Sequence, residues 1–413
     1  MITPEEALER ILKSIGPLPP ERVPLIESLG RVLAEDVISD IDVAPFDNSA
    51  MDGYAVRAED VRDASQDAPV VLRVVDYVPA GKMPEREVGT GEASRIMTGA
   101  PMPEGADAVV KVEVTRGLEN DGGPGGTVEI QRPVRPSENV RYRGEDVRVG
   151  DVVMKAGESV GAAGIGLLAA MGYHHVTVHR KPRVGIVSTG DELVEVAERP
   201  GPGRIRNSNA WSLSAQVLEA GGEPVVLGIA RDTEEETKAL LGRAPEFDLM
   251  LSTGGVSMGD FDVVKSVLTG MGEMDFWKIA QRPGSPLTFG RIGGAPFFGL
   301  PGNPTATMVS FELYVRPMMR LMEGHAAISR PHVIAVLAVD VRKKPGKRYY
   351  WRGRLRREEG RLVVETTGNQ SSALLTSMHL ANCLMVLPEE ATAIPAGSLV
   401  DCMRLDMEEG AAE

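Results

Sequence analysis

Cysteine is nearly absent from this chain: Cys383 and Cys402 are the two cysteines among 413 residues. Two thiols are too few for a disulfide framework or a four-thiolate zinc site. We therefore expect a chain that works in a reducing compartment. The first residues, MITPEEALERILKSIG, have neither the basic region nor the apolar core of a secretory signal. The predicted location is cytoplasmic.

Positive charge and long apolar runs are also scarce. The formal net charge is −14, which argues against a broad nucleic-acid-binding surface. The most apolar stretch, SVGAAGIGLLAAMGY (159–173), is rich in glycine and shorter than the ~20 residues that cross a bilayer. We interpret it as a buried helix. Neither a nucleic acid nor a membrane is expected as a partner.

Several common catalytic motifs are missing. The chain has no G-x-x-x-x-G-K-[ST], no strand-linked G-x-G-x-x-G in its α/β region, no nucleophile elbow and no C-x-x-C. His174, His175 and His179 lie at a turn and along a strand without a second ligand motif nearby, so no metal role is assigned to them. Any phosphate binding must use another geometry.

What is present predicts a multidomain α/β and β protein. A helix over residues 3–15 begins with Thr3 as N-cap and Pro4 at the first helical position. Strands and helices alternate in the third quarter of the chain, which predicts a doubly wound α/β domain with a parallel sheet. Short β-branched runs elsewhere predict β-rich domains. The predicted domains are a small linking α+β domain (1–45 plus 141–178, although helix 3–15 could pack elsewhere), a β-rich inserted domain (46–140), the α/β domain (179–326) and a C-terminal β-barrel (327–413).

Two strands of the α/β domain end in the same three residues, Ser-Thr-Gly. The stretches are GIVSTGDEL (185–193) and LMLSTGGVS (249–257). Parallel neighbours would open both loops at one sheet edge, where backbone N–H groups can bind an anion. Tight turns between strand and helix are the alternative. The candidate ligand-binding residues are Ser188, Thr189, Gly190, Ser252, Gly254 and Gly255.

Carboxylates follow both loops. Asp191, Glu192, Asp232, Asp260 and Asp262 supply hard oxygen ligands, which suit Mg²⁺ bound together with a phosphate. Helix N-capping could instead explain Asp232 and Asp260.

Two basic residues and two proline-containing turns follow these carboxylates along the chain. FWKIAQRPGSP (276–286) contributes Lys278 and Arg282, which are either anion ligands or solvated surface charge. GLPGNP (299–304) joins a strand to a helix through Pro301, Gly302 and Pro304, with Asn303 as a candidate cap. The residues alone predict a multidomain protein that binds a phosphate-bearing anionic ligand together with Mg²⁺.

Seven stretches together resemble one family over nearly the whole chain. They are PFDNSAMDGYAVR, RIMTGAPMPEGADAVV, ENVRYRGED, VSTGDEL, STGGVSMGDFD, FWKIAQRPGSP and GLPGNPTATMVSFELYVRP, in this order. The chain resembles the molybdopterin molybdenumtransferases, the MoeA-type family that also forms the C-terminal domain of gephyrin. A lone STGDEL would also fit the molybdopterin adenylyltransferases, which resemble the α/β domain alone.

The resemblance implies an enzyme with a specific reaction. Adenylylated molybdopterin and molybdate would enter, molybdenum would be placed on the dithiolene, and AMP would leave with the help of Mg²⁺. It also implies a homodimer whose site combines domains of both subunits. Molybdopterin adenylyltransferase and apo-molybdoenzymes are the protein partners that it suggests. Alternatives are an adenylyltransferase, a tungstate-preferring paralogue, or a scaffold protein.

Residues that match functional positions of the family come from several domains. The resemblance implies catalytic roles for Asp52, Thr98, Asp146, Glu192, Asp232, Asp262, Lys265 and Lys278, with Glu192 and Asp262 also as metal ligands. It adds Arg282, Pro301, Pro304, Arg352 and Ser372 as binding residues. Arg282 and Ser285 stand where lysine is common in the family, so the cleft is expected to lack one positive charge at Ser285.

Overall fold

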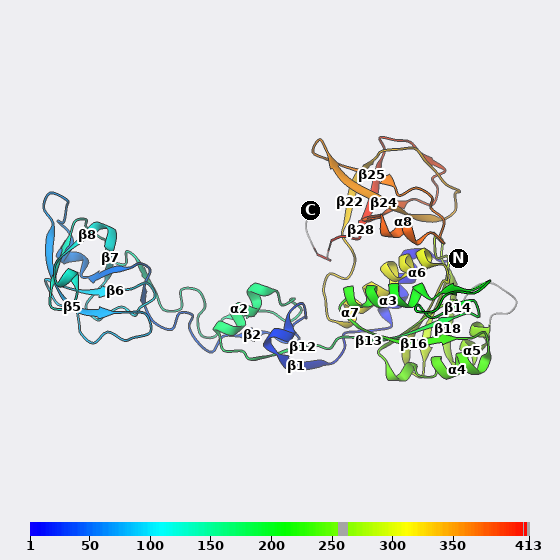
Figure 1. The fold of residues 1–413 in the computed structure, drawn as a ribbon, viewed down its shortest axis with the longest axis horizontal. Helices are drawn as coiled ribbons and strands as arrows, with labels where there is room; N and C mark the ends of the chain where they lie inside the picture. Colours follow the sequence, from blue (N-terminus) through cyan, green and yellow to red (C-terminus); the bar gives the residue numbers. More distant parts are fainter. Residues whose placement is uncertain (255–262, 408, 411–413) are drawn as a thin grey trace. The chain divides into compact units, whose positions relative to one another are not determined.

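The computed structural model describes residues 1–254, 263–407 and 409–410, with residues 121, 263–266 and 276 described by their backbone (Figure 1). The chain forms two compact units. The larger one consists of Met1–Glu35, Ala156–Ile165 and His175–Glu413, and the smaller one of Asp36–Lys155 and Gly166–His174. The division into four domains stays a prediction.

A six-stranded sheet lies at the centre of the larger unit. Its order is β16-β13-β17-β21-β20-β18. The first four strands are parallel: β16 (Glu223–Ala230), β13 (Arg183–Thr189), β17 (Leu249–Thr253) and β21 (Ala295–Leu300). The antiparallel strands β20 (Pro286–Ile292) and β18 (Gly272–Lys278) complete the sheet. The parallel sheet is confirmed, whereas its antiparallel extension was not predicted.

Helices cover both faces of this sheet, as a doubly wound fold requires. On one face, Ile11, Val217 and Met318 pack with Phe298 of β21. The helices there are α1 (Pro4–Lys13), α3 (Ser208–Glu219), α6 (Pro304–Ser310), the π-helix η6 (Phe311–Val315) and α7 (Arg316–Met322). On the other face lie α4 (Glu234–Leu241) and α5 (Val263–Met271), where Leu241 and Leu268 pack with Phe297.

The N-terminal helix begins where the sequence predicts. The Thr3 hydroxyl accepts a hydrogen bond from Glu6 N at 3.1 Å, and Pro4 opens the helix. Just before it, Ile2 pairs with Ile279 through backbone bonds to Lys278 and Ala280. The chain's first residues are therefore hydrogen-bonded to the segment 278–280 at the end of β18.

The C-terminal region closes into the predicted β-barrel. Its five strands follow the order β24-β25-β22-β28-β26, and a β24–β26 pairing closes the ring. These strands are β22 (His332–Leu337), β24 (Arg348–Glu358), β25 (Arg361–Thr366), β26 (Cys383–Leu387) and β28 (Leu399–Arg404). The short β19 (Gln281–Arg282) runs parallel to the start of β24. Cys383 and Cys402 are both buried in the barrel core as free thiols.

Shorter elements complete the larger unit. They are β1 (Pro20–Pro24), η1 (Leu25–Ser28), β12 (His175–His179), β14 (Leu193–Val194), β15 (Ile205–Arg206), η5 (Ala244–Glu246), β23 (Val341–Arg342), α8 (Leu375–His379) and β27 (Ala393–Ile394).

The smaller unit is β-rich, as predicted. Its main sheet has the order β7-β4-β6-β5-β9-β8, and Tyr54, Leu72 and Val110 contribute to its buried core. The strands are β4 (Gly53–Val56), β5 (Val70–Val78), β6 (Glu92–Ile96), β7 (Ala108–Lys111), β8 (Thr115–Glu119) and β9 (Thr127–Ile130). Also present are β2 (Val37–Ile38), β3 (Asn48–Ser49), η2 (Ala58–Val61), η3 (Val112–Val114), η4 (Asn120–Gly122), β10 (Val140–Arg141) and β11 (Val152–Met154).

The apolar helix α2 (Ala162–Ala170) differs from its prediction. It is helical, but Leu168 alone among its nine residues is buried. Glycine and alanine side chains offer little area to pack, so an apolar composition did not produce a buried helix. Among the described residues, no helix combines the length and the apolar character needed to cross a membrane.

Candidate active site

Both Ser-Thr-Gly loops open at the same edge of the central sheet. Strands β13 and β17 are parallel neighbours, with Ser188 opposite Thr253. The Thr189 hydroxyl donates to Thr253 O at 3.3 Å. Gly254 has φ +93°, and a Cβ there would lie 2.6 Å from Thr189 O, so a side chain is disfavoured by both conformation and space. The predicted juxtaposition of the two loops is therefore found.

The GLPGNP turn joins the same edge. Thr253 donates its hydroxyl to Pro301 O at 3.2 Å. Asn209, from helix α3, donates to the Thr253 hydroxyl and to Gly302 O, both at 2.8 Å. Gly302 lies beside Gly254, whose Cα would be 3.5 Å from a Cβ on Gly302. Three strand ends thus form a bare backbone surface held together by side-chain hydrogen bonds.

The two serines of the motifs lie deeper. Ser188 is buried, and its hydroxyl donates to the side-chain oxygen Oδ1 of Asn207 at 2.9 Å. The same oxygen caps helix α3 by accepting from Ala210 N. Ser252 is likewise buried, and its hydroxyl has no hydrogen-bond partner among the described residues. In this structure Ser188 supports a helix start, whereas the glycines form the exposed part of each loop.

Carboxylates gather beside the first loop. Asp191 N donates to the Asp232 carboxylate at 3.3 Å, and Asp232 N donates to the Asp191 carboxylate at 3.4 Å. Helix α4 is capped by Thr233, so the alternative explanation of Asp232 as a helix cap is wrong. Glu192 is exposed, and a Cβ on Gly190 would overlap its carboxylate. These acidic residues are therefore available to a ligand.

Four predicted residues have no described side chain. Gly255 and Asp262 lie outside the described residues, as does Asp260. Lys265 is described by its backbone, in helix α5. Within the described part of the chain, no group of three or more His, Cys, Asp or Glu side chains is arranged to hold a metal ion.

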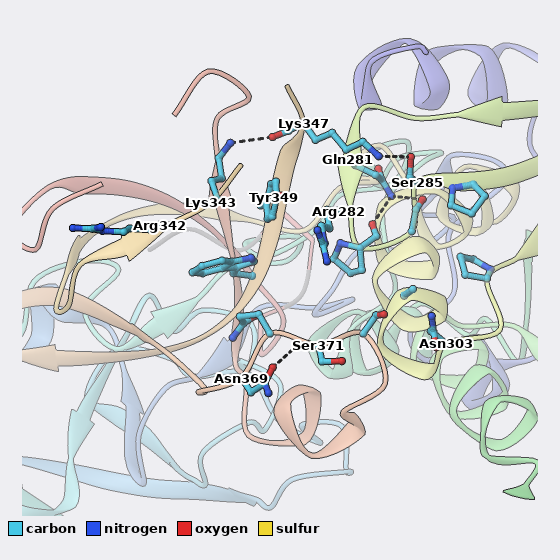
Figure 2. A pocket seen from close by; sticks show the side chains of 18 residues that line it. Gln281, Arg282, Ser285, Asn303, Arg342, Lys343, Lys347, Tyr349, Asn369 and Ser371 are labelled. Atoms are coloured by element: carbon cyan, nitrogen blue, oxygen red, sulfur yellow. Dashed lines mark hydrogen bonds between the residues drawn. The ribbon is translucent and has the colours of Figure 1, made fainter. Parts of the chain in front are cut away.

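A pocket of about 670 Å³ lies between the loop after β18 and the β-barrel (Figure 2). Arg282, Pro301 and Ser372, all predicted as binding residues, line it together with Ser285. The other lining residues are Gln281, Pro283, Gly284, Pro286, Asn303, Ala306, Arg342, Lys343, Lys347, Tyr349, Trp351, Asn369, Gln370 and Ser371.

This pocket is basic in an acidic protein. Arg282, Arg342, Lys343 and Lys347 line it, and none of its described lining residues is acidic. The Arg282 guanidinium lies 5.8 Å from the centre of the Tyr349 ring and the Lys343 ammonium 4.9 Å from it, both within cation–π range. Burial lowers the pKa of Lys343. The arrangement favours a small anion with several negative charges.

Sequence reasoning missed the three cations that the barrel contributes. Arg342, Lys343 and Lys347 belong to the basic run RKKPGKR (342–348). A basic run in a chain of net charge −14 could have indicated an anion-binding site. It was passed over because a run of like charges is ordinarily solvated surface.

Arg352 lies behind the pocket wall rather than in it. Its side chain is fully buried. The guanidinium donates to Ser377 Oγ at 3.1 Å and to Ser371 O at 3.0 Å, while Nη1 has no partner among the described residues. Burial lowers the pKa of Arg352 to about 10. Arg352 thus positions the 371–372 segment and places a cationic side chain behind it.

Lys278, Gly302 and Pro304 are not among the pocket-lining residues. Lys278 is exposed at the end of β18, paired with Pro286. Pro304 opens helix α6, where Asn303 occupies the cap position without a side-chain hydrogen bond. Asn303 is therefore the N-cap residue, as predicted, but its side chain does not form the expected capping hydrogen bond.

In the smaller unit, Asp52 and Thr98 meet directly. Thr98 donates to Asp52 Oδ1 from its backbone N–H and its hydroxyl, each at 2.7 Å. The backbone hydrogen bond, then the hydroxyl, lowers the pKa of Asp52. Asp146 is exposed, with its backbone N–H bonded to Val43 O at 3.2 Å. Two of the three predicted residues of this unit are therefore brought together.

The fold and these loops define a class of protein: a doubly wound α/β domain with a glycine-rich ligand-binding edge, flanked in sequence by β-rich regions on either side. Three family models match in order: the MoeA N-terminal region (domain I and II) at residues 2–172, a probable molybdopterin binding domain at 185–321, and the MoeA C-terminal region (domain IV) at 335–405. The chain belongs to the molybdopterin molybdenumtransferase (MoeA) family.

Relatives agree along nearly the full length. The molybdopterin molybdenumtransferase of Bacillus subtilis is 38% identical over 98% of this chain and 94% of its own length. That of Haemophilus influenzae is 37% identical over 97% and 98%, respectively. Two crystal structures of the molybdopterin biosynthesis MoeA protein of Pyrococcus horikoshii match with TM-scores of 0.82 and 0.81 and identities of 35% and 32%. They cover 99% and 98% of this chain, and each is itself matched over 100% of its length.

Proposed function

We propose that this enzyme inserts molybdenum from molybdate into adenylylated molybdopterin and releases AMP, forming the molybdenum cofactor. The observation that carries the proposal is the pocket of about 670 Å³ whose described lining has four cationic side chains and no acidic one. A tetrahedral oxyanion of charge −2 suits such a lining, because charge-assisted hydrogen bonds from Arg and Lys are stronger than neutral ones.

The bare sheet edge suits the pyrophosphate link of the other substrate. Gly190, Gly254 and Gly302 leave the backbone accessible, so a phosphate can approach main-chain N–H groups. The residues that we assign to this binding surface are Thr189, Gly190, Gly254, Gly255, Pro301, Gly302 and Pro304, with the buried Ser188 and Ser252 supporting it from below. We assign Arg282 and Ser372 to the oxyanion, and Arg352 to positioning the segment that carries Ser372.

The carboxylates beside the first Ser-Thr-Gly loop are suitable ligands for Mg²⁺. Glu192 presents an exposed carboxylate there, and Asp262 is proposed as the second ligand, since Mg²⁺ is usually held by one or two carboxylates plus substrate phosphates. Bound Mg²⁺ would neutralise phosphate charge as AMP departs. We assign Asp232, Lys265 and Lys278 to orienting the phosphates and balancing their charge.

We also propose a homodimer in which Asp52, Thr98 and Asp146 complete the site of a partner subunit. An exposed apolar stripe on helix α3 supports an association between copies. Trp211 and Leu218, seven positions apart, are 56% and 63% exposed, and residues spaced this way share one helix face.

We propose the cytoplasm as the location, with molybdopterin adenylyltransferase supplying the substrate and apo-molybdoenzymes taking the product. The four predicted domains are kept as the proposed organisation.

The test is a defined reaction with purified protein. Incubation with adenylylated molybdopterin, Mg²⁺ and molybdate should release AMP and yield a product that activates an apo-molybdoenzyme. Replacing molybdate by tungstate in a parallel reaction measures the preference between the two oxyanions. ATP consumption with unmodified molybdopterin, without AMP release from the adenylylated form, would contradict the proposal and favour an adenylyltransferase.

A further inference from the structure

Lys347 reaches from the barrel to the loop of the α/β region. Its ammonium donates to Ser285 Oγ at 3.1 Å, across 62 positions of sequence. Figure 2 shows this bond at the wall of the basic pocket, which both residues line. The sequence predicts a cleft short of one positive charge at Ser285. The structure places the Lys347 ammonium on the Ser285 hydroxyl, so a cation from the barrel stands beside the uncharged serine.

Ser285 is itself held firmly. Its hydroxyl donates to Ile279 O at 2.8 Å, and its carbonyl accepts from Ile279 N at 2.8 Å. Inside the same turn, Gln281 donates to Pro283 O at 3.2 Å and to Gly284 O at 3.1 Å. Because the hydroxyl proton is used on Ile279, the oxygen lone pairs are oriented toward the Lys347 ammonium.

The segment that carries Lys347 is anchored as well. Lys343 donates to Lys347 O at 3.1 Å and to Glu389 O at 3.2 Å. Gly346 N also donates to Glu389 O, at 2.8 Å. The backbone beneath Lys347 is thus fixed on the barrel, and the Lys347 side chain is left to span the pocket wall.

The neighbouring cation differs in its partners. Arg348 forms ion pairs with Glu5 and Glu389, so its charge is neutralised within the protein. Among the described residues, Lys347 forms no ion pair with a carboxylate; its hydrogen-bond acceptor is the neutral Ser285 hydroxyl. An ammonium has three N–H donors, and Ser285 takes one of them.

We infer that Lys347 is an oxyanion-binding residue of this pocket and that Ser285 is the positioning residue that holds its ammonium there. The inference rests on the proposed function in naming molybdate as the anion. A lysine side chain loses considerable rotamer freedom when it is fixed. The hydrogen bond to Ser285 therefore prepares Lys347 for an incoming dianion.

The test measures binding of molybdate alone, by titration calorimetry at low ionic strength, without molybdopterin or Mg²⁺. Lys347→Ala should weaken binding about fivefold, as expected for one partly exposed charge pair. Lys344→Ala is the matched control, because Lys344 is an exposed cation in the same run and does not line the pocket; its affinity should equal wild type. Sulfate should respond to Lys347→Ala in the same way as molybdate.

Relocating the charge makes the test sharper. The double variant Ser285→Lys, Lys347→Ala moves the ammonium to the other side of the hydrogen bond and should recover affinity to within about twofold of wild type. Ser285→Ala should raise the molybdate KM of the insertion reaction without lowering kcat, and Ser285→Thr, which keeps a hydroxyl, should restore it. Thermal unfolding verifies that each variant is folded.

The outcomes separate this inference from the proposed function. Unchanged molybdate binding in folded Lys347→Ala, equal losses in Lys347→Ala and Lys344→Ala, or no binding by wild type would each overturn the inference. Because no molybdopterin is present, a failure of the insertion reaction would leave the binding result intact. Loss in Lys347→Ala with recovery in the double variant would support it.

Discussion

Thr98 binds one oxygen of Asp52 twice, through its backbone N–H and its hydroxyl, each at 2.7 Å. Hydrogen bonds to a carboxylate favour its ionised form, and the pKa of Asp52 is lowered accordingly. We predict that Thr98→Val, which retains the N–H but lacks the hydroxyl, raises the pKa of Asp52 toward its ordinary value of 3.8. Carboxyl-carbon NMR titration measures this.

Thr98→Ser is the control for that titration, because it keeps both donors and should leave the pKa of Asp52 lowered. A carboxyl whose pKa is lower in the folded than in the unfolded protein stabilises the fold at pH values above its unfolded-state pKa. That stabilisation disappears as pH falls through its folded-state pKa. Equal pKa values in wild type and Thr98→Val would show that the hydroxyl contributes nothing.

Gly254 and Gly302 face each other at the sheet edge but should respond differently to alanine. A Cβ at Gly254 meets Thr189 O at 2.6 Å and requires φ +93°, whereas at Gly302 the nearest atom is 3.5 Å away. Gly254→Ala should therefore cost about 1–3 kcal/mol of stability, and Gly302→Ala close to nothing. Urea unfolding of both variants is the measurement, and similar stabilities would contradict this view of the edge.

Arg352 should contribute to function at the expense of stability. Burial lowers the pKa of its guanidinium to about 10, so at neutral pH the native state carries a charge that the site disfavours. Arg352→Met should leave the melting temperature unchanged or raise it by a few degrees, because an apolar side chain commonly replaces a buried charge at no net cost. Molybdate binding should weaken in the same variant. A large fall in melting temperature would mean that the bonds to Ser371 and Ser377 outweigh the burial cost.

Glu409 forms a buried ion pair with Arg316, their side chains being 1% and 4% exposed. Burial raises the pKa of Glu409, but the hydrogen bond and charge of Arg316 outweigh it and the net shift is downward. Glu409→Gln should cost up to about 3 kcal/mol at pH 7, because it removes the nearer carboxylate of buried Arg316 and leaves Glu312, at 4.0 Å, as its carboxylate partner. Since the folded-state pKa of Glu409 lies below its ordinary value of 4.5, the stability difference should be full above pH 4.5 and should disappear as pH falls through the lower, folded-state pKa.

Unfolding curves of wild type and Glu409→Gln between pH 3 and pH 7 test this prediction. A stability difference that stays constant over the whole range would show that Glu409 acts through packing rather than charge.

Subunit exchange tests whether Asp52 and Glu192 serve one site from different copies. Glu192→Ala alone should lower the insertion rate on the order of 10²–10³-fold, as for loss of one preorganised electrostatic contact. Mixing inactive Asp52→Ala and Glu192→Ala subunits should restore activity, because one of the two sites of a mixed dimer is then intact. No recovery after verified exchange would mean that each subunit builds its own site.

The sequence predicted the parts of the fold that local pattern determines. Alternating strands and helices predicted the doubly wound domain, and the two Ser-Thr-Gly repeats predicted a shared edge. The β18–β20 hairpin was missed because the run around Phe276 and Trp277 lacks a clean period-two pattern and is bounded by glycines. Sheet extension of this kind is decided by tertiary context rather than by local propensity.

The candidate site was predicted in part. Arg282 and Pro301, which conspicuous loops carry, and Ser372, which the family resemblance supplied, line one pocket. Lys347 could not be found this way, because its contact with Ser285 depends on how the barrel meets the loop. Asp232 was ambiguous for a different reason: the next residue, Thr233, is an equally good cap, and it is the one used.

The pairing of Ile2 with Ile279, and of Glu5 with Arg348, has a consequence for synthesis. Ala7 and Ile11 of helix α1 pack in a core that extends to Met322, so a ribosome must pass Met322 before that core is complete. The partner of Glu5 comes later still, 343 positions along the chain. Residues 36–155 and 166–174 form a compact unit with its own core, and this unit can fold while the rest of the chain is still being made. Contacts of such high sequence separation form slowly, because loop closure precedes any gain from packing. The wall that carries Ser285 is therefore among the last parts of the molecule to become rigid.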